Sequence, residues 1–522
     1  MSISYLFEGE DVSKIGVISK LKNSNIGKVT DKKDKLTCLG YYRQDKDVFF
    51  FLPRVFNKTN TEELIKKDLS TWLYSSIKRY RERKQTVIAN EIEGDVISTS
   101  LDSNTKDTLL DHFLALENFY NRNKELILLI YKESHRGYNR VNWAKTVRHC
   151  IPIISKKNGK VNVAYTEVFN ERQHIHDQEE LMVLFFSTLR YIQQEYNYPM
   201  PQNEYYTLIG VSEFETMVEN QCICPRLKSI RQQYFNDRMQ ELWDLLYAFH
   251  NKLDNNNDNI SAGNHNIEYL LATNFDRVFE DMIDYLIGDT KLEKLKGHED
   301  NRIIDHIFMG RSLFGGANSK VYYIADSKYY DPDHEIKGTS IAKQYDYARN
   351  IIQLVRDHVN DVKHEKKYDC IDMNVAKSYY DELTHGYNVT PNFFIRPNEY
   401  KEADETNKLG FKLHKEIGLN EVNCVFQHKG RLFDRSTLFL LHYDINLSYV
   451  LDVYSKENTE ERNRIKKIIE DNVRKDLDSF IKQEYDLKEM SERVPEPLFY
   501  YNNLGKLFGI GGKLYMALPK NK

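Results

Sequence analysis

The apolar residues of the chain form runs with different periods, and each period predicts a different kind of element. Val48–Leu52 is a continuous apolar run that stops at Pro53, as expected of a strand buried on both faces. Farther along, apolar residues recur every three or four positions and predict helices that begin near residue 108 and continue over 179–196 and 225–253. We therefore expect a mixed, strand-bearing N-terminal domain, residues 1–117, and a mainly helical middle region, residues 118–253.

The second half of the chain alternates between the two periods. It predicts, in order, a helix over 274–288, strands over 302–309 and 321–327, a helix over 339–359 and a strand over 392–396. The stretch 254–265 is rich in Asn and Asp, so we interpret it as a linker and place the last domain boundary there. The sequence thus predicts an α/β domain over residues 266–522, with a mixed sheet flanked by helices.

Two charged residues interrupt the end of the strand predicted over 321–327. Asp326 and Lys328 follow an aromatic and aliphatic run, and side chains two positions apart on a strand share a face. A buried strand accepts such charges only where each has a partner. Asp305 lies on an otherwise apolar face of the preceding strand, and Gly315-Gly316 between the two strands predicts that they pair as a hairpin.

A hairpin can bring Asp305 and Asp326 within about 5 Å of each other. Two carboxylates at that range repel each other unless a cation lies between them. We expect Mg²⁺, because it takes oxygen ligands and is commonly held by one or two carboxylates together with substrate phosphate. Lys328 could then offset charge on a phosphate that is being cleaved. The alternative is a structural ion pair without a catalytic role.

Two of the predicted helices supply further candidates. Glu280 falls beside the apolar stripe of the helix over 274–288 and could supply another acid; the alternative is a surface carboxylate near Arg277. Gln344 lies in the first part of the helix over 339–359, outside its apolar stripe. It could reach the same site or remain on the surface.

Composition and charge narrow the function classes. A formal charge of −4 over 522 residues argues against a uniformly basic nucleic-acid coat, so such contacts must come from local patches. One patch is 64–84, where seven Lys or Arg face two acids; it is either a solvated helix face or a surface for phosphate or a partner. The six cysteines complete no zinc site or disulfide framework, and no run suits a signal peptide or a membrane span. We expect a cytoplasmic protein that does not associate with membranes.

The charged residues of the second half resemble a known nuclease signature. Asp305, Asp326-Ser327-Lys328 and Gln344 are similar to the PD-(D/E)XK motif, with Ile304 in place of the proline of its name. The wider run from Asn274-Phe275-Asp276 to Lys343-Gln344-Tyr345 resembles the LlaJI family of restriction endonucleases, and 431–438 adds to the likeness. Gly137, Val141-Asn142-Trp143, Thr146 and Pro152 resemble the pattern before the nuclease domain of McrC, the subunit that works with the GTP-hydrolysing AAA+ ring McrB.

The resemblance implies a PD-(D/E)XK core and a restriction endonuclease subunit that hydrolyses DNA with Mg²⁺ in defence against foreign DNA. Asp305 and Asp326 would bind the metal with Glu280 as a further acid, Lys328 would assist at the scissile phosphate, and Gln344 would complete the site. The sequence has no glycine-rich loop ending in Gly-Lys-Ser/Thr, so a motor would be a separate McrB-like AAA+ GTPase.

Other partners and two alternatives follow from the same resemblance. One such centre cuts one strand, so double-strand cleavage needs a homodimer or paired complexes, and a companion DNA methyltransferase belongs to ordinary restriction systems. The N-terminal domain would recognise DNA or dock the motor. The alternatives are an inactive nuclease fold that binds DNA or acts in an assembly, and a stand-alone nuclease without an NTPase partner.

Overall fold

The structure, a computed structural model, describes residues 3–11, 35–45, 47–58, 63–85, 95–98, 107–124, 130–136, 140–157, 159–175, 179–203, 205–261, 266–297, 303–313, 319–330, 336, 338–360, 371, 373–381, 386–387, 390–399, 408–414, 424–426, 439–490, 507–510 and 513–520. The chain forms two compact units. Unit 1 comprises Met1–Ser4, Tyr42–Phe49 and Thr99–Tyr269; unit 2 comprises Tyr5–Tyr41, Phe50–Ser98 and Leu270–Lys522.

Helices dominate unit 1. They are α3 (Leu109–Arg122), α4 (Trp143–His149), α5 (Glu180–Tyr196), α6 (Val211–Glu219), α7 (Ile223–Ile230), the 3-10 helix η3 (Arg231–Gln233) and α8 (Asp237–Ser261). Two predicted starts are confirmed by their caps. Thr108 and Asp111 each accept a hydrogen bond from the other's backbone N–H at the start of α3, and Glu179 accepts one from Met182 at the start of α5.

Two sequence predictions for unit 1 are wrong. The helix expected over 225–253 is divided into α7 and α8, because α8 packs back on α7 and the indole of Trp243 donates to the carbonyl of Leu227 over 2.6 Å. The stretch interpreted as a linker is helical as far as Ser261, and 262–265 lie outside the described residues. Asn is a poor helix former. Here the buried stripe of α8 extends past Leu253 to Asn256, so packing overrides propensity.

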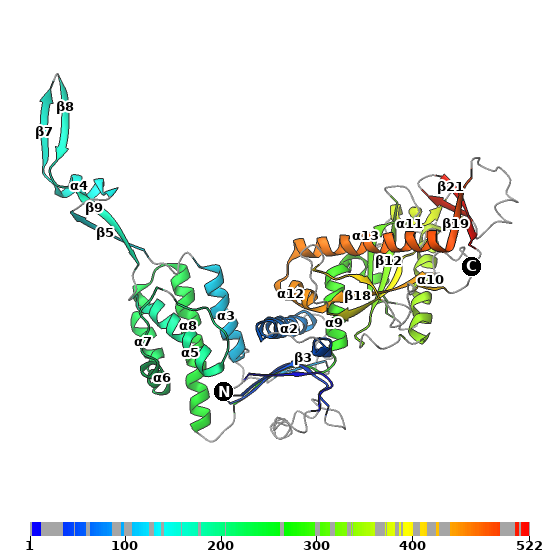
Figure 1. The fold of residues 1–522 in the computed structure, drawn as a ribbon, viewed down its shortest axis with the longest axis horizontal. Coiled ribbons are helices and arrows are strands. Elements are labelled where there is room, and N and C mark those ends of the chain that lie inside the picture. Colours follow the sequence, from blue (N-terminus) through cyan, green and yellow to red (C-terminus); the bar gives the residue numbers. More distant parts are fainter. Residues whose placement is uncertain are drawn as a thin grey trace. The chain divides into compact units, whose positions relative to one another are not determined.

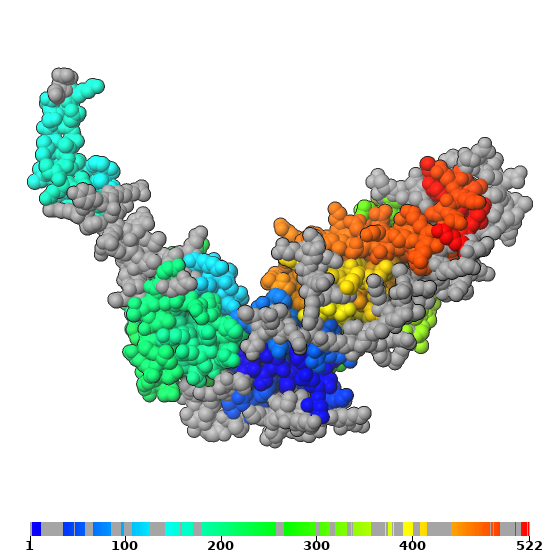
Figure 2. Space-filling view, in the orientation of Figure 1, coloured from blue at the N-terminus to red at the C-terminus, as the bar shows by residue number. Residues whose placement is uncertain are grey.

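Strands occupy the segment between α3 and α5. They are β5 (Ile130–Arg136), β6 (Arg140–Val141), β7 (Pro152–Lys157), β8 (Lys160–Tyr165) and β9 (Phe169–Ile175). β9 pairs with β5 and β6, whereas β7 and β8 form a separate two-stranded hairpin (Figure 1). Its apolar side chains are exposed, and in Figure 2 the cyan hairpin has no other described atoms of unit 1 over the face turned to the viewer.

Unit 2 holds the α/β core. Its elements are η1 (Arg54–Lys58), α2 (Glu63–Gln85), β4 (Val96–Ser98), α9 (Phe275–Ile287), η4 (Thr290–Leu295), β11 (His306–Arg311), β12 (Lys320–Ser327), α10 (Gly338–Asn360), α11 (Met373–Tyr379), β13 (Tyr380–Asp381), β14 (Gly386–Tyr387), β15 (Asn392–Asn398), β16 (Lys412–Leu413), β17 (Cys424–Phe426), β18 (Phe439–Asn446), α12 (Leu447–Lys456), α13 (Thr459–Glu484), β19 (Tyr485–Glu489), β20 (Leu507–Ile510) and β21 (Lys513–Pro519). The predicted order of helix, two strands, helix and strand is confirmed in α9, β11, β12, α10 and β15.

The central sheet of unit 2 is mixed, as predicted. Its order is β11-β12-β15-β18-β16, with β17 also paired to β18. β11 is antiparallel to β12, while β12, β15 and β18 run parallel to one another. Smaller sheets are formed by β13 with β14, and by β19, β21 and β20 in that order.

Helices cover both faces of this sheet (Figure 1). Asp326 and Phe394 are register partners and share a face, and Tyr345 of α10 packs in one cluster with Phe394. On the opposite face, His306 lies against α9, and the Lys466 ammonium of α13 lies 5.3 Å from the ring centroid of Phe308. Alternation along the strands therefore separates the side chains toward α10 from those toward α9.

A second sheet has the order β1-β3-β2-β10-β4, where β1 is Ile3–Phe7, β2 is Leu39–Gln44, β3 is Asp47–Leu52 and β10 is Ile267–Ala272. β3 confirms the strand predicted from the apolar run over 48–52. Gly40 has a φ of +132°, and a Cβ there would lie 2.2 Å from the carbonyl oxygen of Leu270. Only glycine fits this close approach. Within the described residues, no helix is both long and apolar enough to cross a membrane.

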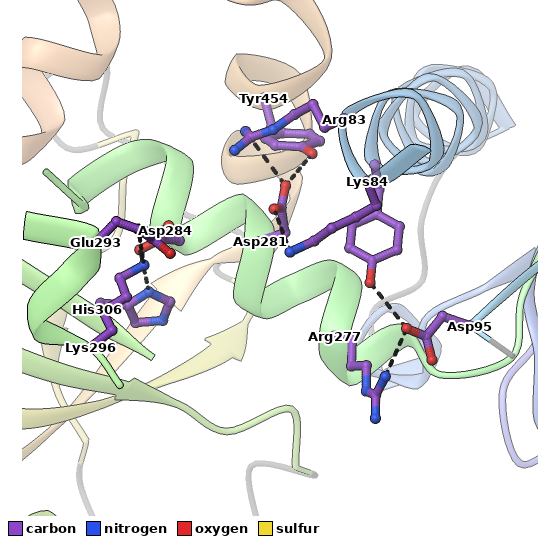
Figure 3. Close-up of polar contacts among 11 residues, drawn as sticks. Arg83, Lys84, Asp95, Arg277, Asp281, Asp284, Glu293, Lys296, His306 and Tyr454 are labelled. Carbon is purple, nitrogen blue, oxygen red and sulfur yellow. Dashed lines mark hydrogen bonds and ion pairs between the residues drawn. The ribbon is translucent and has the colours of Figure 1, made fainter. Parts of the chain in front are cut away.

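Several cations of the basic helix α2 contact other elements of unit 2. The guanidinium of Arg79 lies 4.2 Å from the ring centroid of Tyr285 and pairs with Glu457. Arg83 and Lys84 form ion pairs with Asp281 of α9 at 3.5 and 3.6 Å (Figure 3). These three cations thus connect α2 to α9 and to the C-terminal end of α12, and a role of the patch in binding phosphate or a partner stays a prediction.

Candidate active site

β11 and β12 pair as the sequence predicts, although the Gly315-Gly316 turn lies outside the described residues. The register places His306 opposite Ala325, so one step beyond the paired strand Asp305 comes opposite Asp326. The backbone N–H of Ser327 donates a hydrogen bond to Oδ2 of Asp305 over 3.1 Å. Both acids thus lie on one face, at the open end of the hairpin.

Lys328 completes the predicted trio. It forms an ion pair with Asp326, whose side chain is buried, and its ammonium lies 6.0 Å from the ring centroid of Phe394. Burial works against the charged ammonium, but the carboxylates of Asp326 and Asp305 outweigh it and raise the pKa of Lys328 above its ordinary value. Lys328 therefore stays a cation beside the acids.

The pKa of the Asp305 carboxyl group is raised, as expected for an acid that lies close to another acid. Burial, then the charges of Asp326 and Glu280, raise its pKa well above the ordinary value. A hydrogen bond with the Asp326 carboxyl adds to the rise, and Lys328 opposes it. In the absence of a further cation, the charged form of Asp305 is therefore disfavoured, as the sequence predicts for two acids at close range.

Glu280 of α9 belongs to the same electrostatic neighbourhood. Its side chain is half-buried, and burial and the charge of Asp326 raise its pKa, against the influence of His306, Lys84 and Lys328. The alternative, a surface carboxylate near Arg277, receives no support: Arg277 pairs with Asp95 at 3.0 Å (Figure 3). The role of Glu280 as a metal ligand stays a prediction.

Gln344 is buried in α10, so the surface alternative is wrong for this side chain. The backbone carbonyl of Gln344 accepts a hydrogen bond from Nδ2 of Asn392 over 2.9 Å, and the neighbouring Tyr345 packs in the cluster of Phe394. Nε2 of Gln344 has no hydrogen-bond partner among the described residues. A buried amide donor of this kind is available to a ligand. Participation of Gln344 in the site stays a prediction.

The donor set suits a hard divalent cation. Within the described residues, no three His, Cys, Asp or Glu side chains stand close enough together to hold one ion. Mg²⁺, however, is commonly held by only one or two carboxylates, with water and substrate oxygens as its other ligands. Asp305 and Asp326 supply that number, and the raised pKa of Asp305 marks a place where positive charge would be stabilised.

A polar set on the other face of the hairpin was missed from the sequence. Nε2 of His306 lies 2.7 Å from Oγ of Ser327, and its Nδ1 lies 3.3 Å from Oδ1 of Asp284 in α9. The ammonium of Lys296 is bonded to the same Asp284 oxygen over 2.8 Å. The sequence did carry a signal for His306, because this titratable residue shares a face with the apolar residues Ile304 and Phe308. The same kind of pattern had identified Asp305.

A second group of polar residues that the sequence analysis missed lies farther along the sheet, on the same face as the two acids. The N–H of Lys328 donates to the carbonyl of Ile395 over 2.9 Å, so buried Arg396 is the next residue of β15 beside it. The guanidinium of Arg396 lies 3.5 Å from His414, whose Nδ1 lies 2.9 Å from Asp444 of β18. The signal was Arg396 directly after the apolar run 393–395 and Asp444 within the largely apolar stretch 439–445.

Comparison with known proteins assigns the chain to a class. A sequence model described as LlaJI restriction endonuclease matches residues 39–401, a range that holds Glu280, Asp305, Asp326, Lys328 and Gln344. The chain is thus a nuclease of the restriction class. It belongs to the LlaJI restriction endonuclease family.

Two other comparisons add little. None of the curated proteins compared with the chain matches it. Among solved structures, it is similar to a chain in the refined half-complex from the tetradecameric assembly of Thermococcus gammatolerans McrB AAA+ hexamers with bound McrC. The identity is 9% and the TM-score 0.28, over 92% of this chain and 100% of that chain, which is too low to argue a shared fold.

Proposed function

We propose that unit 2 contains a PD-(D/E)XK nuclease core that hydrolyses DNA phosphodiester bonds with a divalent metal, in defence against foreign DNA. The observation that carries the proposal is the placement of Asp305 opposite Asp326, with Lys328 paired to Asp326. Family membership supports a nuclease, and the mixed sheet between α9 and α10 is the architecture that such a core requires.

Asp305 and Asp326 would hold the metal, with Glu280 near enough to act on both electrostatically. Bound there, Mg²⁺ would supply a Lewis acid and lower the pKa of a bound water. Lys328 remains charged and offsets negative charge on the phosphorus oxygens as the bond to the leaving oxygen breaks. Gln344 would contribute its free amide N–H to the substrate or to an acid.

Plasmid cleavage tests the proposal. With supercoiled DNA and Mg²⁺, Asp326→Asn and Lys328→Met should each lower the cleavage rate by about 100-fold or more. Lys466→Met is the matched control, because Lys466 is a lysine of similar exposure, 22% against 20%, paired with Asp289 away from the acids. Cleavage by Asp326→Asn at the wild-type rate would sink the proposal and favour an inactive nuclease fold.

The proposed partner is a separate McrB-like AAA+ GTPase, and the β7–β8 hairpin is its proposed docking surface. Exposed apolar side chains gather there and on α4: Trp143, Val147, Ile151, Ile153, Ile154, Val161 and Val163. A two-stranded hairpin is marginally stable in water, so a covering partner is expected. The residues that resemble McrC, Val141 to Trp143, Thr146 and Pro152, lie in this same segment.

A pair of double variants tests this docking. Ile154 and Val163 are cross-strand partners, and Ser155 and Asn162 form the next pair along the hairpin. Ile154→Asp/Val163→Asp should weaken binding to the GTPase by about tenfold or more, since it places charges in the apolar interface. Ser155→Asp/Asn162→Asp adds the same charge and should bind normally. Equal binding by both variants would remove the hairpin as the docking site, and GTP-independent cleavage would favour a stand-alone nuclease.

A further inference from the structure

The side of the β11–β12 hairpin that faces α9 carries a chain of hydrogen bonds outside the proposed active site. His306 is fully buried and lies between Ser327, 2.7 Å from its Nε2, and Asp284, 3.3 Å from its Nδ1. Lys296 binds the same carboxylate oxygen of Asp284 and also pairs with Glu293 at 3.1 Å (Figure 3). None of these residues takes part in the chemistry proposed above.

The charge of Asp284 fixes the direction of its hydrogen bond with His306. Burial works against ionisation, but the contacts with His306 and Lys296 outweigh it and lower the pKa of Asp284 to about 2. The carboxylate therefore accepts from Nδ1–H of His306. Nε2 of the same ring lies 2.7 Å from Oγ of Ser327 and forms the other hydrogen bond of the chain.

The same chain segments carry the two acids of the proposed metal site. His306 follows Asp305, and Ser327 follows Asp326 and donates its backbone N–H to Asp305 over 3.1 Å. Because side chains alternate along a strand, the hydrogen-bond chain lies on one face and the acids on the other. The imidazole and the backbone N–H thus join the two segments at the point where the carboxylates repel each other.

We propose that Asp284, His306 and Ser327 are positioning residues that hold Asp305 opposite Asp326 and so set the affinity of the site for a divalent cation. The inference rests on the proposed function, because it concerns the same metal site. Groups that orient metal ligands from behind typically change metal affinity or activity by about 10- to 100-fold.

Metal titration of the full chain provides the first test. Ser327→Ala and Asp284→Asn should each raise the dissociation constant for Mn²⁺ by about tenfold or more, whereas Ser327→Thr, which keeps the hydroxyl, should bind nearly as wild type does. Asp289→Asn is the matched control: Asp289 lies just after the end of α9 and, like Asp284, contacts β11, where it accepts a hydrogen bond from the backbone N–H of Met309 over 2.9 Å, away from the acids. Its affinity for Mn²⁺ should equal that of wild type.

Hydrogen exchange in metal-free protein separates this inference from the proposed function. The N–H of Ser327 should exchange faster in Asp284→Asn than in wild type or Asp289→Asn, because its acceptor Asp305 is less well held. If wild type binds no Mn²⁺ but this difference is seen, the proposed metal site is wrong, whereas the role of these residues in holding Asp305 opposite Asp326 stands. An unchanged exchange rate in Asp284→Asn would overturn the positioning role, and so, where wild type binds Mn²⁺, would affinities that do not distinguish Asp284→Asn from Asp289→Asn.

Discussion

Ser327 donates its backbone N–H to Oδ2 of Asp305 over 3.1 Å, and this bond joins the two strands that carry the acids. It holds a carboxyl group where burial, Asp326 and Glu280 all disfavour its charge. The folded chain therefore keeps two acids together at a cost in stability, which a bound cation would offset.

That cost predicts a pH dependence. The pKa of Asp305 is raised in the folded state, so folded protein holds this proton more tightly than unfolded protein, whose Asp has a pKa of about 3.9. Stability in chelator should fall as pH rises above that unfolded value, and Asp305→Asn should lessen the fall, of which the raised pKa of Glu280 leaves a part. Urea unfolding of both proteins from pH 4 to pH 8 measures it, at about 1.4 kcal/mol for each unit by which the pKa is raised.

The control for this pH series is Asp486→Asn, whose side chain is 64% exposed in unit 2. It should follow the wild-type curve. Parallel curves for wild type and Asp305→Asn would show that Asp305 is not strained in the folded chain.

We expect substitution of Asp444 to lower stability, although this residue is not one of the proposed metal ligands. It accepts from His414, 2.9 Å away, and from Asn398, 3.2 Å away, and His414 in turn faces buried Arg396. Asp444→Asn removes the charged acceptor of His414 and Asn398 from this buried network and should lower the free energy of unfolding by about 2 kcal/mol. The exposed Asp486→Asn should change it by less than about 0.5 kcal/mol. Similar values for the two variants would contradict the buried network.

Two glycines with positive φ form a matched pair. Gly40→Ala would place Cβ 2.2 Å from the carbonyl oxygen of Leu270, whereas Gly9→Ala, at a φ of +86°, meets nothing within 4 Å. Gly9→Ala should cost about 1 kcal/mol from its backbone conformation alone, and Gly40→Ala should cost several times more. Thermal unfolding of the two variants measures the difference, and equal costs would mean that the strands β2 and β10 are not held at this distance.

Patterns local in sequence predicted the hairpin well. The alternation of Ile303 to Met309 and of Tyr322 to Lys328 was enough to place Asp305 and Asp326 on one face, because a strand has a fixed period. The apolar stripes of α9 and α10 were also predicted from the sequence, because a helix has its own fixed period. The register that sets the two acids opposite each other needed the pairing itself.

What the sequence could not predict depends on partners far along the chain. The cations of α2 were recognisable as a charge patch, but Asp281 and Glu457, which pair with them, lie in segments whose approach no local pattern encodes. The same holds for Asp284 with His306. The Asn-rich end of α8 was misread because the buried stripe before it outweighs the low helix propensity of Asn.

Crystals of the full chain soaked in Mn²⁺ test the account most directly, because the anomalous signal locates this ion without assumptions about the protein. The account predicts one ion bound by carboxylate oxygens of both Asp305 and Asp326, at about 2.1 Å as for Mg²⁺, with Lys328 beside it. An ion bound elsewhere, with the two carboxylates apart, would contradict the central claim.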